Sequence, residues 1–253
     1  MKMNKKATAL LSNLGIILFW LLVWEGANAL IPSNIIIVSP RVTFARLFQL
    51  AVTAEFWYTI GTSLERIMHG FLLALGVGVL LALISARFKL FYQLVLPAVN
   101  VINATPIASF VVIAIMAVGT ANLSHFVSFV TVLPIVFFNT YKGIVSTDPM
   151  LLEMANVFNV PLWKRVVYIY FKTTAPYIVA AAQVGIGFAW KSGIAAELIG
   201  LVRGTIGFSL HTARSFLLTA DIFAWTITII LLSYLMEKIF LLIFGRVIKW
   251  KSD

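Results

Sequence analysis

Residues 70–84 read GFLLALGVGVLLALI, and this stretch decides the class of fold. It lies within residues 67–86, between Arg66 and Arg87, where no Asp, Glu, Lys or Arg occurs. A helix that crosses a bilayer needs about 20 mostly apolar residues, whereas a surface helix of a soluble protein is apolar along one stripe only. The stretch therefore predicts a transmembrane helix over residues 58–85.

The rest of the chain has the same bias. Of its 253 residues 61% are hydrophobic, and the mean hydropathy is +1.01, whereas soluble domains are about 45–50% apolar. Further apolar runs bring the predicted number of transmembrane helices to about six: 8–31, 96–118, 123–141, 174–199 and 218–244. We expect an all-α integral membrane protein in which residues 1–253 form a single domain, with its core over about 55–245.

The net charge of +10 is typical of nucleic-acid-binding proteins too, but here the basic residues stand at the ends of apolar runs. With the N-terminus inside, 13 Lys and Arg residues fall on the inner side: Lys2, Lys5, Lys6, Arg87, Lys89, Lys142, Lys164, Arg165, Lys172, Lys238, Arg246, Lys249 and Lys251. Four fall outside: Arg41, Arg46, Arg203 and Arg214. This bias predicts cytoplasmic termini and no nucleic-acid partner.

The N-terminus has two interpretations. Residues 1–6 are basic and Ala27-Asn28-Ala29 resembles a signal-peptidase site, as in a cleaved leader. The apolar run before that site is too long for a leader, and Glu25 lies just before it. We therefore expect the segment to stay as the first transmembrane helix.

Two of the predicted loops carry helical patterns. The extracytoplasmic loop 31–57 has an amphipathic pattern after Pro40, which predicts a short interfacial helix; its apolar positions are Val42, Phe44, Ala45, Leu47, Phe48 and Ala51. The second loop, 143–173, is the longest polar stretch on the cytoplasmic side.

Within loop 143–173, Asp148 is suited to cap a helix that has Pro149 at its first position. Leu151, Leu152, Ala155 and Phe158 recur at helical spacing on one face. Asn159 suits a left-handed terminating position, and Pro161 prevents continuation. The pattern predicts a short helix, which is either an ordinary interfacial helix or one that docks in a groove of a soluble partner.

The same loop resembles the cytoplasmic signature of ATP-binding-cassette (ABC) importer permeases. That signature is Glu-Ala-Ala, three residues, Gly, nine residues, and Ile-x-Leu-Pro. Glu153, Ala155 and Ile169 match it. Four positions differ from the signature: Met154 replaces Ala, Asn159 replaces Gly, Phe171 replaces Leu and Lys172 replaces Pro. A proline, Pro176, follows four residues after Lys172. Asn and Gly both tolerate the left-handed conformation, so that change is mild.

Other stretches extend the resemblance, in order, over residues 35–245. They are similar to the permeases for nitrate, sulfonates, taurine, bicarbonate and pyrimidine precursors. The matching stretches are Thr62-Ser63-Leu64-Glu65-Arg66 with Gly70, Pro97, Pro106, Phe138-Asn139-Thr140, Ala189-Trp190-Lys191, Ala196-Glu197-Leu198-Ile199-Gly200 and Ala213-Arg214-Ser215-Phe216.

The resemblance implies a coupling helix between the fourth and fifth transmembrane helices that docks on an ABC ATPase. Its coupling residues would be Leu152, Glu153, Ala155, Asn159 and Pro161. It also implies two ATPase subunits, a second permease copy, identical or different, an extracytoplasmic substrate-binding protein and membrane lipid. The location it implies is a bacterial plasma (inner) membrane that the chain crosses several times. The chain lacks the GxxxxGK[ST] phosphate loop, so ATP and Mg²⁺ would bind to the partner ATPase and this chain would hold no cofactor.

Three ionisable residues are candidates for the pathway or gate: Lys191, Glu197 and Arg66. Charges at membrane depth are costly and usually face the bundle interior or water. Small residues recur at i, i+4 spacing in the second helix, at Gly70, Ala74, Gly78 and Ala82, and indicate either close helix packing or a sliding surface.

No catalytic or metal site is predicted, because the three histidines lack ligand spacing and no nucleophile–base set is readable. The main alternative is a secondary transporter or channel that works alone; an intramembrane enzyme is a weaker one. The resemblance implies that the substrate is a sulfonate-, nitrate- or taurine-like anion or a pyrimidine-like compound, and Lys191 favours the anion.

Overall fold

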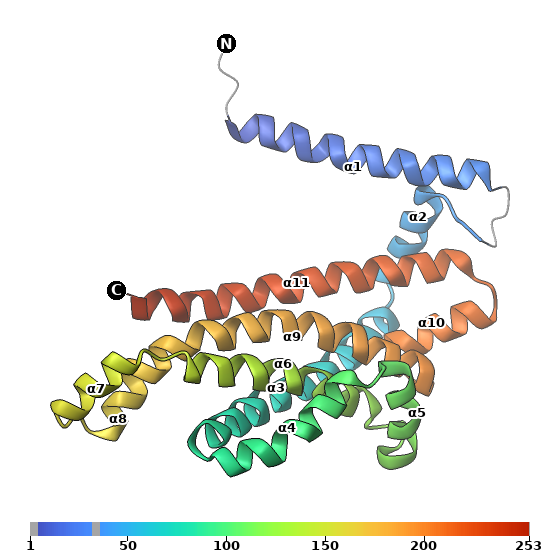
Figure 1. Cartoon of the computed structure of the whole chain (residues 1–253). Helices are drawn as coiled ribbons and strands as arrows, with labels where there is room; N and C mark the ends of the chain where they lie inside the picture. The colour runs from blue at the N-terminus through green and yellow to red at the C-terminus, as the bar shows by residue number, and fades with distance from the viewer. Residues whose placement is uncertain (1–4, 32–35, 253) are drawn as a thin grey trace. The chain divides into compact units, whose positions relative to one another are not determined.

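The computed structural model describes residues 5–31 and 36–252, and side chains over 14–31 and 36–242. Regular structure in these ranges is entirely helical (Figure 1). The helices are α1 (Lys5–Leu30), α2 (Pro40–Ala51), α3 (Ala54–Arg87), α4 (Lys89–Ala104), α5 (Ile107–Val118), α6 (Leu123–Val145), α7 (Pro149–Val157), α8 (Leu162–Arg165), the π-helix η1 (Val166–Tyr170), α9 (Phe171–Gly200), α10 (Ile206–Ser215) and α11 (Thr219–Ser252).

Four helical stretches in the described part are long and apolar enough to cross a membrane: Ala54–Arg87, Leu123–Val145, Leu162–Gly200 and Thr219–Leu242. A fifth span results if α4 and α5 are counted as one. In α1 the stretch Leu14–Leu30 is a shorter apolar helix. The all-helical membrane class is thus confirmed, whereas the six spans, the cytoplasmic termini and the single domain stay predictions. Residues 1–4 and 253 lie outside the described residues.

The predicted third span, 96–118, is wrong as a continuous helix. The chain breaks at Thr105-Pro106, and α4 and α5 meet at an angle of 111°. Proline disfavours the helical conformation of the residue before it, and Thr105 is extended, with φ −77° and ψ 126°. Apolar residues on both sides concealed the break, because hydropathy does not register a change of direction.

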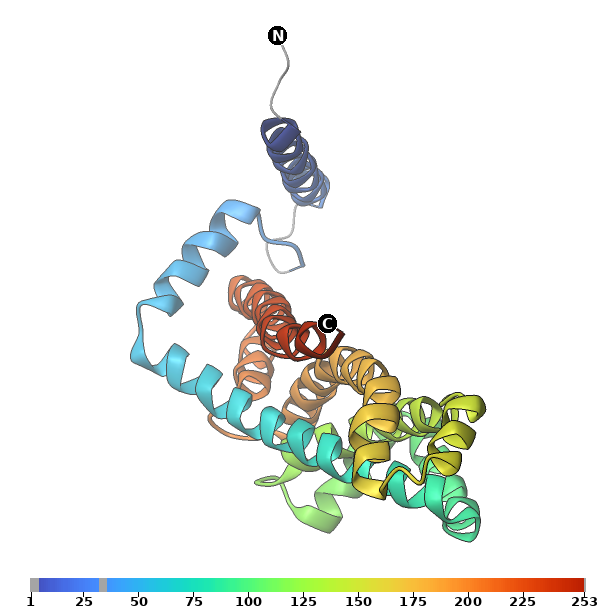
Figure 2. The ribbon, with the colours of Figure 1, turned by 90° about the vertical axis from the view of Figure 1, so that its left-hand side faces the viewer.

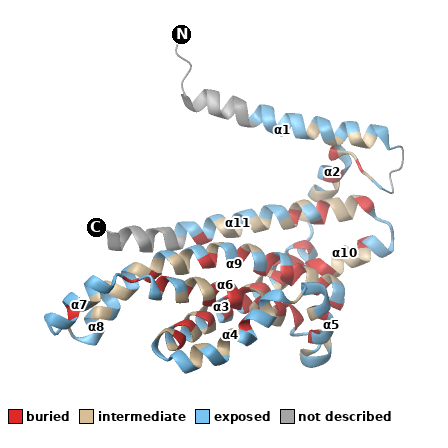
Figure 3. Cartoon of the chain, in the orientation of Figure 1, coloured by how far each residue is buried: buried red, intermediate tan, exposed pale blue. Residues whose placement is uncertain are grey.

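The chain forms two compact units, residues 1–58 with 209–230 and residues 59–208 with 231–253. In the larger unit α6 and α9 lie side by side, with α5 packed against both (Figure 1). One core cluster of this unit contains Val111, Leu123, Val127 and Ala196. Figure 2 shows the same helices from the side, and Figure 3 shows that buried residues concentrate where α3, α6 and α9 meet.

The small residues of α3 are packed against α6. Ala74 and Ala82 are fully buried. A Cβ at Gly78 would lie 2.8 Å from a Val136 methyl carbon, and one at Gly70 would overlap the backbone oxygen of His125. Close approach of two helix backbones needs such residues. The stripe therefore makes a tight helix contact in this structure.

In the smaller unit, aromatic contacts join α1, α2 and the first part of α11. The indole of Trp24 donates to the backbone oxygen of Val38 at 3.0 Å and stacks on Phe223 with ring centroids 5.6 Å apart. The predicted helix after Pro40 is α2, which begins with Ser39 as its cap and Pro40 in its first turn.

Candidate functional site

A carboxylate lies inside the larger unit where α9 ends. The side chain of Glu197 is fully buried. The Ser63 hydroxyl of α3 donates to its Oε2 at 2.8 Å, and the Ser124 hydroxyl of α6 donates to its Oε1 at 3.2 Å. The backbone N–H of Gly207 in α10 donates to Oε2 at 3.2 Å. One carboxylate thus holds three other helices at one point.

This carboxylate also completes the N-terminus of α10, whose first N–H groups have no partner within their own helix. The N–H of Ile206 donates to Ser63 Oγ at 2.9 Å, and that of Phe208 donates to Thr205 Oγ1 at 3.3 Å. With the bond from Gly207, the first three N–H groups of α10 all donate to side-chain oxygens. An anion at a helix N-terminus is electrostatically favoured, so Glu197 fits this position as an acceptor.

The three candidate pathway residues occupy different surroundings. Lys191 is exposed on α9, on a different face from the buried Glu197. It shares its face with Val184, Phe188 and Ile199, which are exposed as well. The Arg66 guanidinium donates to the backbone oxygen of Ala121 at 3.1 Å and thereby holds the loop before α6. The structure therefore does not bring these three side chains together.

The structure has the helix cap, the starting proline and the left-handed ending that the sequence predicted for α7. The Asp148 carboxylate accepts from the Met150 N–H at 2.9 Å, and Pro149 begins the helix. Asn159 is left-handed, with φ 48°. The N–H of Val160 donates to the Ala155 oxygen at 2.9 Å and that of Asn159 to the Asn156 oxygen at 3.1 Å. This pair of bonds is a Schellman ending, after which Pro161 leads into α8.

Arg165 holds α7 and α8 together as a hairpin, which sequence reasoning missed because it treated Arg165 only as a topology charge. Its guanidinium donates to the backbone oxygens of Val160 at 2.7 Å and Ala155 at 3.0 Å, and also to the Asn156 side chain. Nothing in the sequence distinguishes Arg165 from the adjacent Lys164, so no local signal could have found it.

The outer surface of this hairpin is apolar and exposed. The exposed residues are Met150, Leu151, Met154, Val157, Phe158, Leu162 and Trp163. Glu153 is exposed beside them, whereas Leu152 is half-buried and Ala155 is buried. Figure 1 shows α7 and α8 beyond the end of α6, at the start of the long run α8–η1–α9. Contiguous exposed apolar residues of this kind mark an interaction surface.

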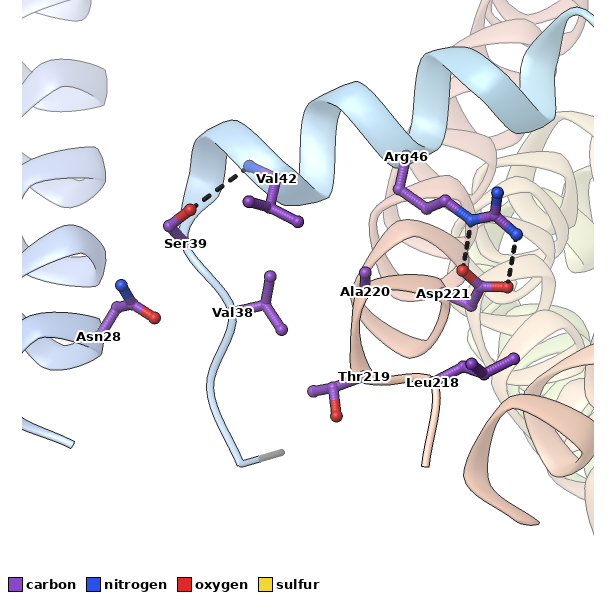
Figure 4. Close-up of a pocket in the computed structure, with 9 residues that line it drawn as sticks. All are labelled: Asn28, Val38, Ser39, Val42, Arg46, Leu218, Thr219, Ala220 and Asp221. Atoms are coloured by element: carbon purple, nitrogen blue, oxygen red, sulfur yellow. Dashed lines mark hydrogen bonds and ion pairs between the residues drawn. The ribbon is translucent and has the colours of Figure 1, made fainter. Parts of the chain in front are cut away.

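A second polar pair lies in the smaller unit, beside a hollow of about 440 Å³. The Arg46 guanidinium of α2 and the Asp221 carboxylate of α11 bond through two atom pairs, at 2.5 and 3.0 Å (Figure 4). The hydrogen bond to Asp221 raises the pKa of Arg46 above its ordinary value, and the carboxylate charge adds to this. Because Asp221 neutralises Arg46, the described lining of this hollow offers no uncompensated cation to an anionic ligand.

Two further polar features lie within the helices that are long and apolar enough to cross a membrane. Glu237 of α11 accepts a hydrogen bond from the Gln183 amide of α9 at 3.0 Å. His69 and His125 form an edge-on ring pair with centroids 5.2 Å apart. Within the described residues, no group of three or more His, Cys, Asp or Glu side chains could hold a metal ion.

Comparison with known proteins gives a family match over most of the chain. The model of the family described as "Binding-protein-dependent transport system inner membrane component" matches residues 74–249. The matched range contains the α7–α8 hairpin and Glu197.

Curated relatives have concordant names. The putative aliphatic sulfonates transport permease protein of Bacillus subtilis (strain 168) is 23% identical over 234 residues, which cover 91% of this chain and 84% of that protein. The taurine transport system permease protein of Escherichia coli (strain K12) is 20% identical over 258 residues, 99% of this chain and 92% of that protein. The nitrate import permease protein of Synechococcus elongatus (strain ATCC 33912) is 28% identical over 152 residues, 60% of this chain and 54% of that protein.

Proposed function

Because this chain belongs to the family of binding-protein-dependent transport system inner membrane components, we propose that it is the membrane-spanning subunit of an ABC importer. In this proposal an extracytoplasmic binding protein delivers a small solute, and two ATPase subunits on the cytoplasmic side drive its import. The chain itself carries out no ATP chemistry. ATP binding would shift the permease from one arrangement to another. It can do so only by as much free energy as ATP binds the transporter more tightly in one arrangement than in the other.

The observation that carries this proposal is the exposed apolar surface of the α7–α8 hairpin. Exposing contiguous apolar side chains to water is unfavourable, and no other segment of the described chain covers these. The hairpin is built to be rigid, because it is capped by Asp148, ended by Asn159 and held by Arg165. A rigid apolar helix that fits a groove is a recurrent docking mode. We assign Leu152, Glu153, Asn159 and Pro161 to the ATPase contact, and the buried Ala155 supports the helix from inside the hairpin.

The exposed face of α9 supports a second copy of the permease. Val184, Phe188, Lys191 and Ile199 line one side of a helix that is buried on its other sides. If this face meets its twin at a twofold axis, two Lys191 ammonium groups border the pathway. Of the three candidates, Lys191 is then the pathway residue, and Glu197 and Arg66 hold the helix ends that surround it.

The substrate we propose is a small anion of the sulfonate, nitrate or taurine type. The names of the relatives and the Lys191 charge support this class. In reconstituted vesicles, Lys191→Met should lower ATP-driven uptake of such anions at least about tenfold, because a desolvated charge contact to an anion contributes about 1.5–3 kcal/mol. ATPase binding should be unchanged, and Lys191→Arg should retain part of the uptake.

The importer proposal is tested by purifying the chain from its native membrane in mild detergent and identifying the proteins that accompany it. We expect an ABC ATPase with the wild type and at least tenfold less with Glu153→Lys. Glu65→Lys is the matched control, because it reverses an exposed charge in the first half of α3, outside the hairpin, and should leave the ATPase yield unchanged. A stable chain that carries no ATPase and transports without ATP would favour the secondary transporter instead.

A further inference from the structure

A hollow of about 730 Å³ opens between α3, α6 and the run η1–α9 in the larger unit. Its walls are mostly apolar and include Leu83, Ile144, Val166 and Phe171. Leu83 and Val166 are about half exposed. The volume lies within the range of about 300–1,000 Å³ that is typical of small-molecule sites. The hollow is therefore large enough for part of an amphiphile.

Two buried hydroxyls that line the hollow have no hydrogen-bond partner. They belong to Thr140 of α6, which is 0% exposed, and Thr174 of α9, which is 5% exposed. Threonine in a helix commonly donates to the backbone four residues earlier, as Thr131 and Thr173 do. A buried hydroxyl without a partner costs about 1–3 kcal/mol, so an acceptor from a ligand would relieve this cost.

One cation lines the hollow. Arg87 is the last residue of α3 and is exposed, with its guanidinium carbon 5.4 Å from the centre of the Phe88 ring. Among the described residues, no carboxylate lies within ion-pair distance of Arg87, and no acidic residue lines the hollow. The lining thus combines an uncompensated positive charge, two hydroxyl donors and an apolar cleft.

Two irregularities of the helical backbone border the hollow, the π-helix η1 and Pro176 in α9. η1 is a single turn of π-helix, which is wider than an α-helix and common at functional sites. Pro176, five residues into α9, has no N–H to bond the carbonyl of Lys172. Both features interrupt the regular α-helical hydrogen bonding of the run that borders the hollow.

We propose that this hollow binds an anionic phospholipid of the cytoplasmic leaflet. The phosphate lies on Arg87, and one acyl chain fills the apolar part. The Thr140 and Thr174 side chains turn their buried hydroxyls toward the glycerol ester oxygens when the lipid binds. Only the assignment to the cytoplasmic leaflet rests on the proposed function. Basic pockets between transmembrane helices on that side characteristically take anionic headgroups.

Depth along the helices favours a lipid over a soluble anion. Thr140 lies five residues before the end of α6, about 7 Å at the helical rise. The interfacial layer on each side of a bilayer is about 5–8 Å thick. If the end of α6 lies at the level of the phosphates, the Thr140 hydroxyl therefore lies near the ester groups, where a lipid has acceptors. A free anion would leave the apolar walls uncovered.

Such a lipid would lie beside the segment that leads from the α7–α8 hairpin into α9. Leu162 and Val166 border both the hairpin and the hollow. Filling the hollow would stiffen the base of the hairpin. We therefore expect the ATPase activity of the assembled transporter to depend on anionic lipid.

The test measures retained lipid on the purified chain by native mass spectrometry in a mixture of phosphatidylglycerol and phosphatidylcholine. Wild type should retain phosphatidylglycerol preferentially. Arg87→Gln should lower that retention about fivefold, the expected effect of one basic residue near the surface. Leu83→Trp, which fills the hollow, should lower it as well.

The matched control is Leu80→Trp, on an exposed position of α3 that does not line the hollow, and it should leave retention unchanged. Equal retention in all four proteins would overturn the proposal, as would disulfide cross-linking between two copies through Leu83→Cys, because a second copy would then cover the hollow. Lipid retention is measured without ATPase or transport, so its failure is distinguishable from failure of the importer proposal.

Discussion

The two ends of the α3–α6–α9 bundle differ in how well their buried polar side chains are hydrogen-bonded. At the Glu197 end, one carboxylate accepts from two hydroxyls and a backbone N–H, and the N-terminus of α10 is completed. At the other end, the hydroxyls of Ser85, Thr140, Thr147 and Thr174 are buried without partners. Among the described residues, the remaining unpartnered buried side-chain atom is His125 Nδ1, at the Glu197 end.

Except for His125 Nδ1, the described buried polar side-chain atoms at the Glu197 end find partners within this chain, whereas the four hydroxyls at the hairpin end do not. The unpartnered hydroxyls lie at the end that also carries Arg87, the hollow and the apolar hairpin. Satisfied polar networks stiffen and specify a fold, whereas partly satisfied ones cost stability. We infer that the Glu197 end is a fixed frame and that the hairpin end receives the ATPase and lipid.

The largest effect is expected from Glu197→Ala, which breaks the fixed end. The substitution removes the acceptor of the Gly207 N–H and leaves a cavity among three helices. We expect a loss of about 3 kcal/mol in the free energy of unfolding, measured by thermal unfolding in detergent. Glu197→Gln should lose much less, because its amide oxygen can keep the Ser63 and Gly207 bonds while its NH₂ donates to Ser124. Equal losses would show that the charge itself is essential.

Ser63→Ala should lower the free energy of unfolding by less than Glu197→Ala does. The hydroxyl both donates to Glu197 and accepts from the Ile206 N–H, so one substitution removes two bonds of the network. We expect about 1–3 kcal/mol of destabilisation. Hydrogen exchange at the Ile206 amide should rise together with this loss, and unchanged exchange there would contradict the bridging role.

At the hairpin end, Arg165→Ala should act locally. It removes bonds to two backbone oxygens and to the Asn156 side chain, so limited proteolysis of residues 148–166 should accelerate about tenfold. The thermal midpoint of the bundle should shift little, because local opening is separate from global unfolding. Lys164→Ala removes the neighbouring exposed cation and should leave the cleavage rate unchanged.

The smallest effect, and one of opposite sign to that of Ser63→Ala, is expected from Thr174→Val. Its hydroxyl is buried without a partner, so replacing it with a methyl group of similar size should be neutral or stabilise the lipid-free protein by up to about 1 kcal/mol. The measurement is thermal unfolding in lipid-free detergent. A destabilisation as large as that of Ser63→Ala would remove the proposed difference between the two ends.

The sequence predicted those parts of the structure that depend on local chemistry. Asp148, Pro149 and Asn159 act within a few residues of their own positions, so the bounds of α7 followed from them. The apolar runs located α3, α6 and α9 for the same reason. The direction of the chain at Pro106 was missed, because hydropathy is averaged over a window.

The polar network at Glu197 could not be predicted in this way. Ser63 and Glu197 are 134 residues apart, and the hydroxyl is one of many along apolar helices. Its partners depend on how α3, α6 and α9 pack, which no local pattern states. The bracing role of Arg165 and the Arg46–Asp221 pair, which spans 175 residues, were inaccessible for the same reason.

The most direct measurement uses the absence of cysteine from the natural sequence. Single cysteines are introduced as Met154→Cys, on the exposed hairpin, and Arg203→Cys, in the exposed loop after α9, and are labelled with a membrane-impermeant maleimide in right-side-out and inverted vesicles. The account predicts that Cys at 203 reacts only from outside. Cys at 154 should react only in inverted vesicles and be protected by the bound ATPase. Labelling at 154 from outside, or labelling from inside that the ATPase does not reduce, would contradict it.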